Sequence, residues 1–133
     1  MLANRSVYSN TRHAFSLIEV MVVIVIIGLL AGAVTLKVSD NVDKARVARA
    51  KSDISTIMTA VEGYYLSESR YPTNDEGLGV LPIQSSLDPW KRPYQYNAPG
   101  REGPYEIISY GADGLAGGDG INKDIVSSEL DEL

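Results

Sequence analysis

The sequence predicts an α+β fold in which one long N-terminal helix packs on a small antiparallel β-sheet. Residues 20–36 form an uncharged apolar run, and an amphipathic pattern continues from it to about residue 67 without a proline. Two short strand patterns follow Pro72, with turn residues between them. At 133 residues the chain has room for one small domain, so we expect helix and sheet to share one core.

Composition narrows the classes of function. The chain has 17 Asp and Glu residues against 12 Lys and Arg, which argues against nucleic acid as a partner. It has no cysteine, and its one histidine, His13, lies in the segment that we expect to be removed. The mature chain would then lack the commonest general base and the soft metal ligands, which weighs against most enzyme mechanisms.

The apolar run is long enough to cross a membrane. From Phe15 to Leu36 the only charged residue is Glu19. As a helix these residues rise about 33 Å, and the hydrocarbon core of a bilayer is about 30 Å thick. Arg5 and Arg12 precede the run, with no acidic residue before it. By the positive-inside tendency the N-terminus stays in the cytoplasm and the remainder of the chain crosses the membrane.

The small residue Ala14 stands before the apolar run, whereas a secretory signal carries its small cleavage residue after the run. A cut at Ala14 removes a basic leader, residues 1–14, and keeps a membrane helix, residues 15–36, ahead of a domain formed by residues 37–133. Glu19 is a functional candidate, because a carboxylate in a membrane helix is costly. Charge placement alone leaves a second interpretation open, in which Glu19 lies in the headgroup region without a role.

Residues 39–67 predict an amphipathic helix that continues the membrane helix. Apolar residues recur mostly at spacings of three and four, at Val42, Ala45, Ala48, Ile54, Ile57, Met58, Val61, Tyr64 and Tyr65. Charged residues fill the other side. We therefore expect one helix from about Phe15 to Ser67, ended before Pro72, which disfavours helical backbone at Tyr71.

The segment after the helix predicts a loop over residues 73–88 and then two strands. The strands are expected at Pro93–Tyr96 and Tyr105–Tyr110, with a turn at residues 97–100. Trp90 and the tyrosines in this half of the chain could form a surface on which bases or sugars stack. A buried core is the stronger interpretation, because a small domain without disulfides has few other sources of apolar area.

Residues 111–124 form a loop rich in glycine and aspartate. Asp113, Asp119 and Asp124 lie among five glycines, and Lys123 is its one basic residue. Calcium prefers six to eight oxygen ligands, and glycines let a loop turn its carbonyls inward. The spacing is not that of an EF-hand, so the residues alone leave open a calcium site and a plain flexible acidic loop.

The string AFSLIE at residues 14–19, followed by VMVVI, resembles the cleavage and assembly signal of type IV prepilins and pseudopilins. The resemblance implies that a prepilin peptidase cuts between Ala14 and Phe15 and methylates the new amine of Phe15. It also implies that Glu19 pairs with the incoming amine of a neighbouring subunit, since an unpaired buried charge is costly. Ala14 stands where the family usually has Gly, and Leu36 where many members have Pro.

Further strings resemble the major pseudopilin family of type II secretion systems, from Ala14 to Ile125. They are YYL at residues 64–66, RYPT at 70–73, DPWKRPY at 88–94, NAPG at 97–100 and SYGADG at 109–114. The resemblance implies a type IV pilin-like fold and a homopolymer, the periplasmic pseudopilus, that helps export folded proteins. It implies an inner-membrane anchor and, as partners, minor pseudopilins, the prepilin peptidase, and an assembly platform with its ATPase. Lys91 stands after Trp90, where this family usually has Gly.

The same resemblance implies a calcium ion (Ca2+) on the glycine-rich loop. Carried over, Asp113 and Asp124 supply side-chain ligands, while Tyr110 and Leu115 supply backbone carbonyls. Asp119 and Asn122 are the further candidate ligands in this loop.

Two alternatives remain at this point. One is a type IV pilin or competence pseudopilin, although the absence of paired C-terminal cysteines and the calcium-type loop favour the secretion system. The other is a membrane-anchored hydrolase that uses paired carboxylates, with Asp75, Glu76 and Asp88 as candidates. The small domain leaves little room for a cleft of the usual volume, so we expect a structural protein and not an enzyme.

Overall fold

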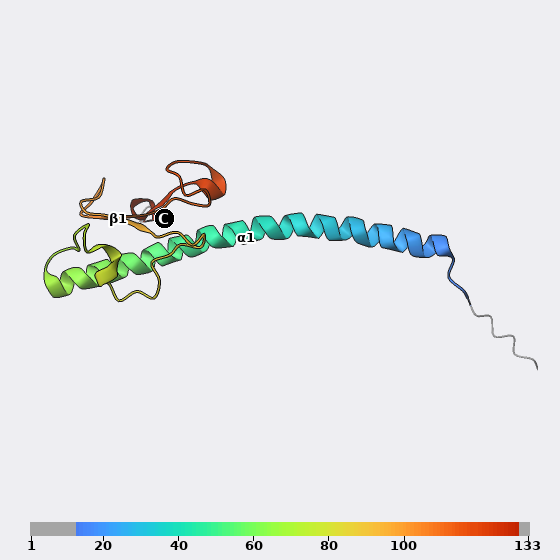
Figure 1. Ribbon diagram of the computed structural model, residues 1–133, viewed down its shortest axis with the longest axis horizontal. Helices are drawn as coiled ribbons and strands as arrows, with labels where there is room; N and C mark the ends of the chain where they lie inside the picture. Colours follow the sequence, from blue (N-terminus) through green and yellow to red (C-terminus); the bar gives the residue numbers. More distant parts are fainter. Residues whose placement is uncertain (1–12, 131–133) are drawn as a thin grey trace, which may run out of the picture. The chain divides into compact units, whose positions relative to one another are not determined.

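The computed structural model describes residues 13–130, except for the side chain of Leu36. Most of the predicted leader, with Arg5 and Arg12, lies outside the described residues. In chain order the elements are α1 (Leu17–Glu68), η1 (Gly77–Val80), β1 (Gln95–Asn97), β2 (Glu106–Ser109), η2 (Gly120–Asn122), β3 (Ile125–Val126) and η3 (Ser127–Glu129). The chain divides into two compact units between Val38 and Ser39, and α1 contributes to both (Figure 1).

Helix α1 has 52 residues, which confirms the expectation of one long helix with no internal break. It ends where the backbone of Ser69 turns to a φ of 56°, a left-handed conformation. The Ser69 amide still donates to the carbonyl of Tyr65 at 2.8 Å. Pro72 follows three residues later and is fully buried, so the chain leaves the helix axis and does not extend it.

The first unit contains the apolar start of α1, and its large side chains are exposed. Phe15 is 82% exposed, Ile24 63% and Leu30 62%. Among the described residues, α1 is the helix that is long and apolar enough to cross a membrane. A surface of this kind is stable only against lipid or other protein, because contiguous exposed apolar patches are rare on soluble proteins.

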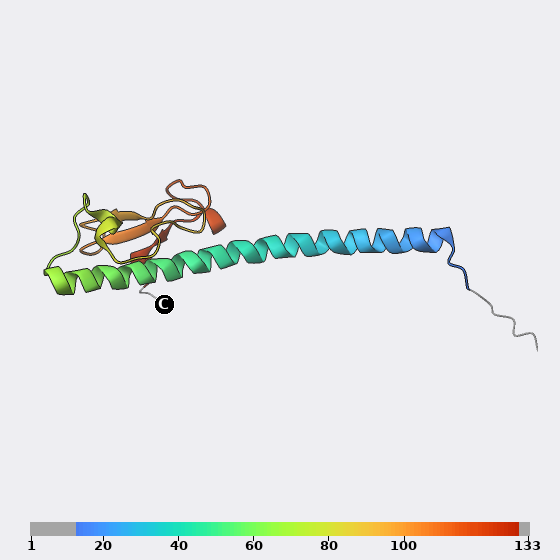
Figure 2. The ribbon, with the colours of Figure 1, turned by 60° about the horizontal axis from the view of Figure 1, so that its bottom comes forward.

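In the second unit one face of α1 is buried against the sheet and the loops, as Figures 1 and 2 show. The buried face contains Ala50, Ile54, Ile57 and Val61, with Val47, Met58, Ala60 and Tyr64 beside them. The prediction that Val42, Ala45 and Ala48 lie on this face was wrong, because all three are exposed. The face begins at Val47, and the sheet sets its phase because it packs against only one side of the helix.

Three antiparallel strands form the sheet in the order β1-β2-β3. In the register, Tyr96 pairs with Ile107 between β1 and β2, and Ser109 pairs with Ile125 between β2 and β3. Strand β2 is central, and all four of its residues are buried. The strand β3 was not predicted, because two residues are too few to show an alternating pattern.

The aromatic residues confirm the predicted core role in most positions. Tyr94 and Tyr96 are buried, and Trp90, Tyr64, Tyr71 and Tyr105 pack partly buried against the core. Tyr71 and Tyr105 both donate a hydrogen bond to the carboxylate of Glu62 on α1. Burial, followed by the charge of Glu62, raises the pKa of Tyr105. These hydrogen bonds connect the segments around Tyr71 and Tyr105 to the second half of α1.

An ion pair stabilises the turn after α1. Arg70 and Glu76 form a bidentate ion pair with both nitrogen–oxygen distances at 2.8 Å. The Glu76 carboxylate also accepts the amide hydrogen of Thr73 at 2.9 Å. The hydrogen bonds from Arg70 and then Thr73 lower the pKa of Glu76 to about 2. The oxygens of Glu76 are therefore satisfied within the chain.

Candidate functional site

The predicted cleavage site lies just before α1. Ala14 and Phe15 are exposed and are not part of the helix. A peptidase needs an accessible bond, and the bond between these two residues is exposed and lies outside the helix. Cleavage and N-methylation themselves stay predictions, because both change the covalent structure and the described chain is unprocessed.

Ser16 and Glu19 form a reciprocal cap at the start of α1. The Glu19 amide donates to the Ser16 hydroxyl at 3.2 Å, and the Ser16 amide donates to a carboxylate oxygen of Glu19 at 3.4 Å. This is the capping-box arrangement of Ser with Glu three residues later. The cap orients the Glu19 carboxylate toward the N-terminal end of its own helix, which is also where the Phe15 amine would lie after cleavage.

The glycine-rich loop leaves β2 and returns as β3, so its two ends are held by adjacent strands. The Ala112 amide donates to the carbonyl of Ile121 at 2.9 Å and closes the loop on itself. Gly111 has a φ of 65°, and a Cβ there would come within 2.8 Å of the Ile121 carbonyl. Gly118 has a φ of 87°, and a Cβ there would come within 2.6 Å of the Asn122 carbonyl oxygen. Both positions require glycine because the backbone is left-handed and closely packed.

Two of the predicted ligands already bind backbone amides. Asp113 Oδ1 accepts the amide hydrogen of Leu115 at 3.0 Å, and Asp124 Oδ2 accepts that of Gly117 at 2.9 Å. Asp124 Oδ1 is buried and has no hydrogen-bond partner among the described residues. A buried carboxylate oxygen without a partner is costly. A hard cation at this oxygen would supply the missing interaction, so the donor set on the loop fits calcium.

The remaining predicted ligands lie on the same loop with different exposure. Tyr110 and Asn122 are half-buried, and Leu115 is 67% exposed. Asp119 precedes η2, and its side chain makes no capping hydrogen bond there. The structure thus keeps the predicted residues on one closed loop.

The three loop aspartates do not form one cluster. Among residues 13–130, no three His, Cys, Asp or Glu side chains gather closely enough to hold a metal ion by themselves. A site on this loop therefore needs backbone carbonyls as well as carboxylates. That composition matches the set implied by the family resemblance, with two aspartates and two carbonyls.

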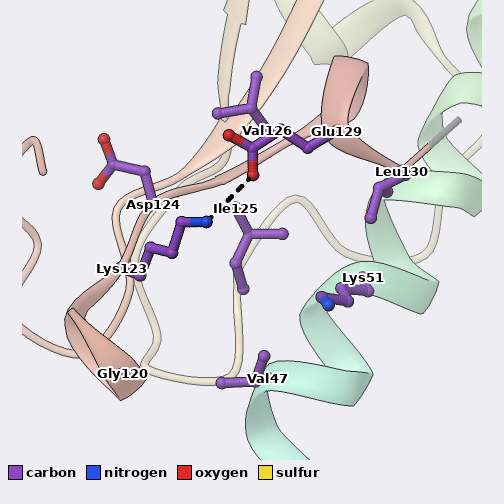
Figure 3. A pocket seen from close by; sticks show the side chains of 9 residues that line it. All are labelled: Val47, Lys51, Gly120, Lys123, Asp124, Ile125, Val126, Glu129 and Leu130. Carbon is purple, nitrogen blue, oxygen red and sulfur yellow. Dashed lines mark ion pairs between the residues drawn. The ribbon is translucent and has the colours of Figure 1, made fainter. Parts of the chain in front are cut away.

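Lys123, the one basic residue of the loop, pairs with a carboxylate outside the loop. Lys123 Nζ lies 3.6 Å from a carboxylate oxygen of Glu129, and in Figure 3 the Asp124 carboxylate points away from this pair. Arg92 instead reaches the loop, and its Nη1 donates to the carbonyls of Gly111 at 3.1 Å and Ala112 at 2.8 Å. Sequence reasoning missed Arg92 because about 20 residues separate it from its partners, and only the DPWKRPY string pointed to that turn.

Two of the three carboxylates proposed for a hydrolase, Glu76 and Asp88, are bound within the chain. Glu76 is bound by Arg70 and Thr73, as described above. Asp88 is buried and accepts hydrogen bonds from the amides of Trp90 and Arg92 at 3.0 and 2.9 Å. Its second oxygen accepts the Ser109 hydroxyl at 2.9 Å. The oxygens of both carboxylates are thus engaged by internal donors, which argues against a pair acting on a substrate.

Comparison with known proteins decides the family. The model of the family "Type II secretion system (T2SS), protein G" matches residues 37–87 and 82–128. The chain belongs to the type II secretion system protein G family. The "Prokaryotic N-terminal methylation motif" matches residues 9–35 of this pseudopilin, over the predicted cleavage and assembly signal. The predicted family is therefore confirmed.

Curated relatives agree over most of their length. The type II secretion system core protein G of Pseudomonas aeruginosa is 40% identical, with 86% of this chain and 93% of that protein aligned. That of Vibrio cholerae is 38% identical, over 84% of this chain and 88% of the relative. The crystal structure of the major pseudopilin of enterohaemorrhagic Escherichia coli matches with a TM-score of 0.54 and 28% identity, over 65% of this chain and 90% of that one. The pilin-like fold and the major pseudopilin role are thereby confirmed.

Proposed function

We propose that this pseudopilin is cut between Ala14 and Phe15, N-methylated on Phe15, and polymerised from the inner membrane into a periplasmic filament that drives export of folded proteins across the outer membrane. The observation that carries the proposal is the apolar, exposed start of α1 in a chain of the protein G family. Lipid would cover this surface before assembly, and the helices of other copies would cover it afterwards.

Glu19 gives the assembly step its selectivity in this proposal. Its carboxylate is held at the end of α1 by the cap with Ser16. An incoming subunit brings the positive amine of Phe15 into an apolar bundle, where an unpaired charge costs several kcal/mol. A carboxylate on the neighbouring subunit offsets that cost only when the two helices are in register.

The proposed partners follow from the family. They are further copies of this chain, minor pseudopilins, the prepilin peptidase, and an inner-membrane assembly platform with its ATPase. Work must come from the ATPase, because this sequence has no Gly-rich phosphate-binding loop ending in Lys and Ser or Thr. The acidic balance of the chain argues against nucleic acid as a partner.

The mass of the mature chain tests the processing step. We expect intact-mass spectrometry of membrane-extracted protein to show loss of residues 1–14 and gain of one methyl group on Phe15. Cells without the peptidase provide the control, and their protein should retain the leader. A mature chain that still begins at Met1 would refute the proposed processing.

We further propose that the loop from Tyr110 to Asp124 binds Ca2+. Asp124 Oδ1 is buried without a partner, and two aspartates lie on a loop closed by its own backbone hydrogen bond. A bound ion would satisfy that oxygen and tie the two ends of the loop together. The periplasmic side of the membrane is the compartment in which the domain would meet the ion.

Thermal melting tests the ion site. Calcium at about 100 times its dissociation constant should stabilise the domain by about 2.7 kcal/mol relative to chelator, and magnesium should substitute poorly. Asp124→Asn should abolish most of the gain, and Asp113→Ala should behave likewise. Asp75→Asn removes one charge from an exposed position outside the loop and is the matched control. If calcium does not shift the melting temperature of the wild type, the loop has no such ion.

A further inference from the structure

Arg92 is the cation that contacts the first turn of the glycine-rich loop. Its Nη1 donates to the carbonyls of both Gly111 and Ala112, at 3.1 and 2.8 Å. Gly114, with a φ of 68°, faces the same guanidinium, because a Cβ there would come within 2.5 Å of Arg92 Nε. One side chain from outside the loop therefore touches three of its residues within one turn, on both sides of the predicted ligand Asp113.

The backbone of Arg92 is itself fixed. Its amide donates to Asp88 Oδ1 at 2.9 Å, and its carbonyl accepts the amide hydrogen of Asp88 at 2.8 Å. The turn between them places Lys91 at a φ of 64°. Asp88 is only 5% exposed and is bound by the hydroxyl of Ser109, the last residue of β2. The buried Asp88, next to the end of β2, thus fixes the backbone of the residue whose side chain contacts the loop.

Arg92 also affects which carbonyls of the loop are left to bind an ion. Those of Gly111 and Ala112 are occupied by the guanidinium. The carbonyls of Tyr110 and Leu115, on either side of this turn, are the ones in the predicted ligand set. Both hydrogen bonds come from one nitrogen, Nη1, whose two hydrogens the planar guanidinium holds in fixed directions, whereas the hydrogens of a lysine ammonium rotate.

We propose that Arg92 is the positioning residue of the ion loop, and that by fixing residues 111–114 before the ion arrives it raises the affinity of the loop for Ca2+. This inference rests on the calcium site proposed above. Pre-organisation removes part of the ordering cost from the binding step. Repulsion between the guanidinium and a divalent cation acts in the opposite direction, so the sign of the mutational effect decides between the two.

The test uses the mature full-length protein in non-ionic detergent. Calcium affinity is measured by isothermal titration, and amide hydrogen exchange is followed in chelator. Three amides report on the loop, because their hydrogen bonds lie within it: those of Ala112, Leu115 and Gly117. The variants are Arg92→Met, Arg92→Lys, and Lys123→Met as a control that removes a positive charge on the loop itself.

We expect Arg92→Met to weaken calcium binding by about tenfold or more and to speed exchange at the three reporter amides. Arg92→Lys should fall between this variant and the wild type, and Lys123→Met should not weaken binding. Unchanged exchange at residues on the buried face of α1 shows that the variant is folded. If Arg92→Met unfolds the domain, Arg92→Lys, which keeps the charge but not the guanidinium, carries the test and should still bind calcium more weakly than the wild type.

Other results overturn the inference. Binding by Arg92→Met that is as tight as, or tighter than, binding by the wild type would show that repulsion outweighs positioning. Exchange that does not change at the reporter amides would show that Arg92 does not order the loop. If the wild type takes up no calcium, the proposed ion site is refuted separately, and the positioning of the loop by Arg92 is then judged by the exchange alone.

Discussion

The two halves of α1 have the same backbone and opposite surroundings. From Leu17 to Leu30 every large side chain is exposed, and Ile24 is 63% exposed. From Val47 to Tyr64 one face is covered by the sheet and loops, and Ile54 is fully buried. The second half is stabilised within its own chain. The first half has no partner in the described residues, so its stability and its role depend on what lies outside the chain.

The comparison separates residues that maintain the fold from residues that act between molecules. In the second unit the carboxylates of Glu62, Glu76 and Asp88 accept hydrogen bonds from donors within the chain. Among residues 13–130, Glu19 in the first unit has hydrogen bonds only with Ser16 at the start of its own helix. Asp124 has one buried carboxylate oxygen without a hydrogen-bond partner among the described residues. We expect ligands and partners at these two carboxylates, because internal donors do not fully bind them.

The largest predicted effect on stability sharpens the comparison with the same substitution in each half. Ile54→Ala should lower the free energy of unfolding of the domain by about 3 kcal/mol, because it leaves a cavity in a well-packed core. Ile24→Ala should leave that free energy unchanged, because the side chain is exposed and lies in the first unit, outside the buried core. Guanidinium titrations of both proteins in detergent measure the difference. Equal losses in both variants would show that the two halves are coupled in stability.

A smaller effect concerns the closed ion pair between Arg70 and Glu76. The pKa of Glu76 is lowered from 4.5 to about 2, so the unfolded chain takes up this proton at a higher pH than the folded chain does. The stabilisation is present above about pH 4.5 and should be lost as the pH falls toward 2. Glu76→Gln and Arg70→Met should each flatten the decline in melting temperature across this range. A decline as steep as that of the wild type in both variants would contradict the assignment.

The sequence predicted α1 well because its signals are long and local. An apolar run, an amphipathic continuation and the absence of proline before Pro72 all act within a few turns of helix. The buried face was predicted less well, since Val47 and Ala50 replace Val42, Ala45 and Ala48. Periodicity defines a stripe, but the sheet that covers it begins at a position that only tertiary packing determines.

The candidate site was predicted in part for a similar reason. The glycine-rich loop and its aspartates are contiguous in sequence, so their composition pointed to an oxygen-rich site. The contribution of Arg92 depends on contacts across about 20 residues and on the buried link between Asp88 and Ser109. Neither leaves a periodic pattern. The two residues of β3 were missed because so short a strand is defined only by its pairing with β2.

The most direct test is the yield of fibres made by Glu19→Leu, compared with Glu68→Leu at the other end of the same helix. Electron microscopy and quantification of sheared fibres measure assembly, while intact mass and membrane fractionation check processing and insertion. We predict that Glu19→Leu is processed and inserted but yields at least about tenfold fewer fibres, because the incoming amine loses its partner. Glu68→Leu should assemble normally. Fibre yield and secretion at the wild-type level in Glu19→Leu would contradict the assignment of the first half of α1 to assembly through that pair.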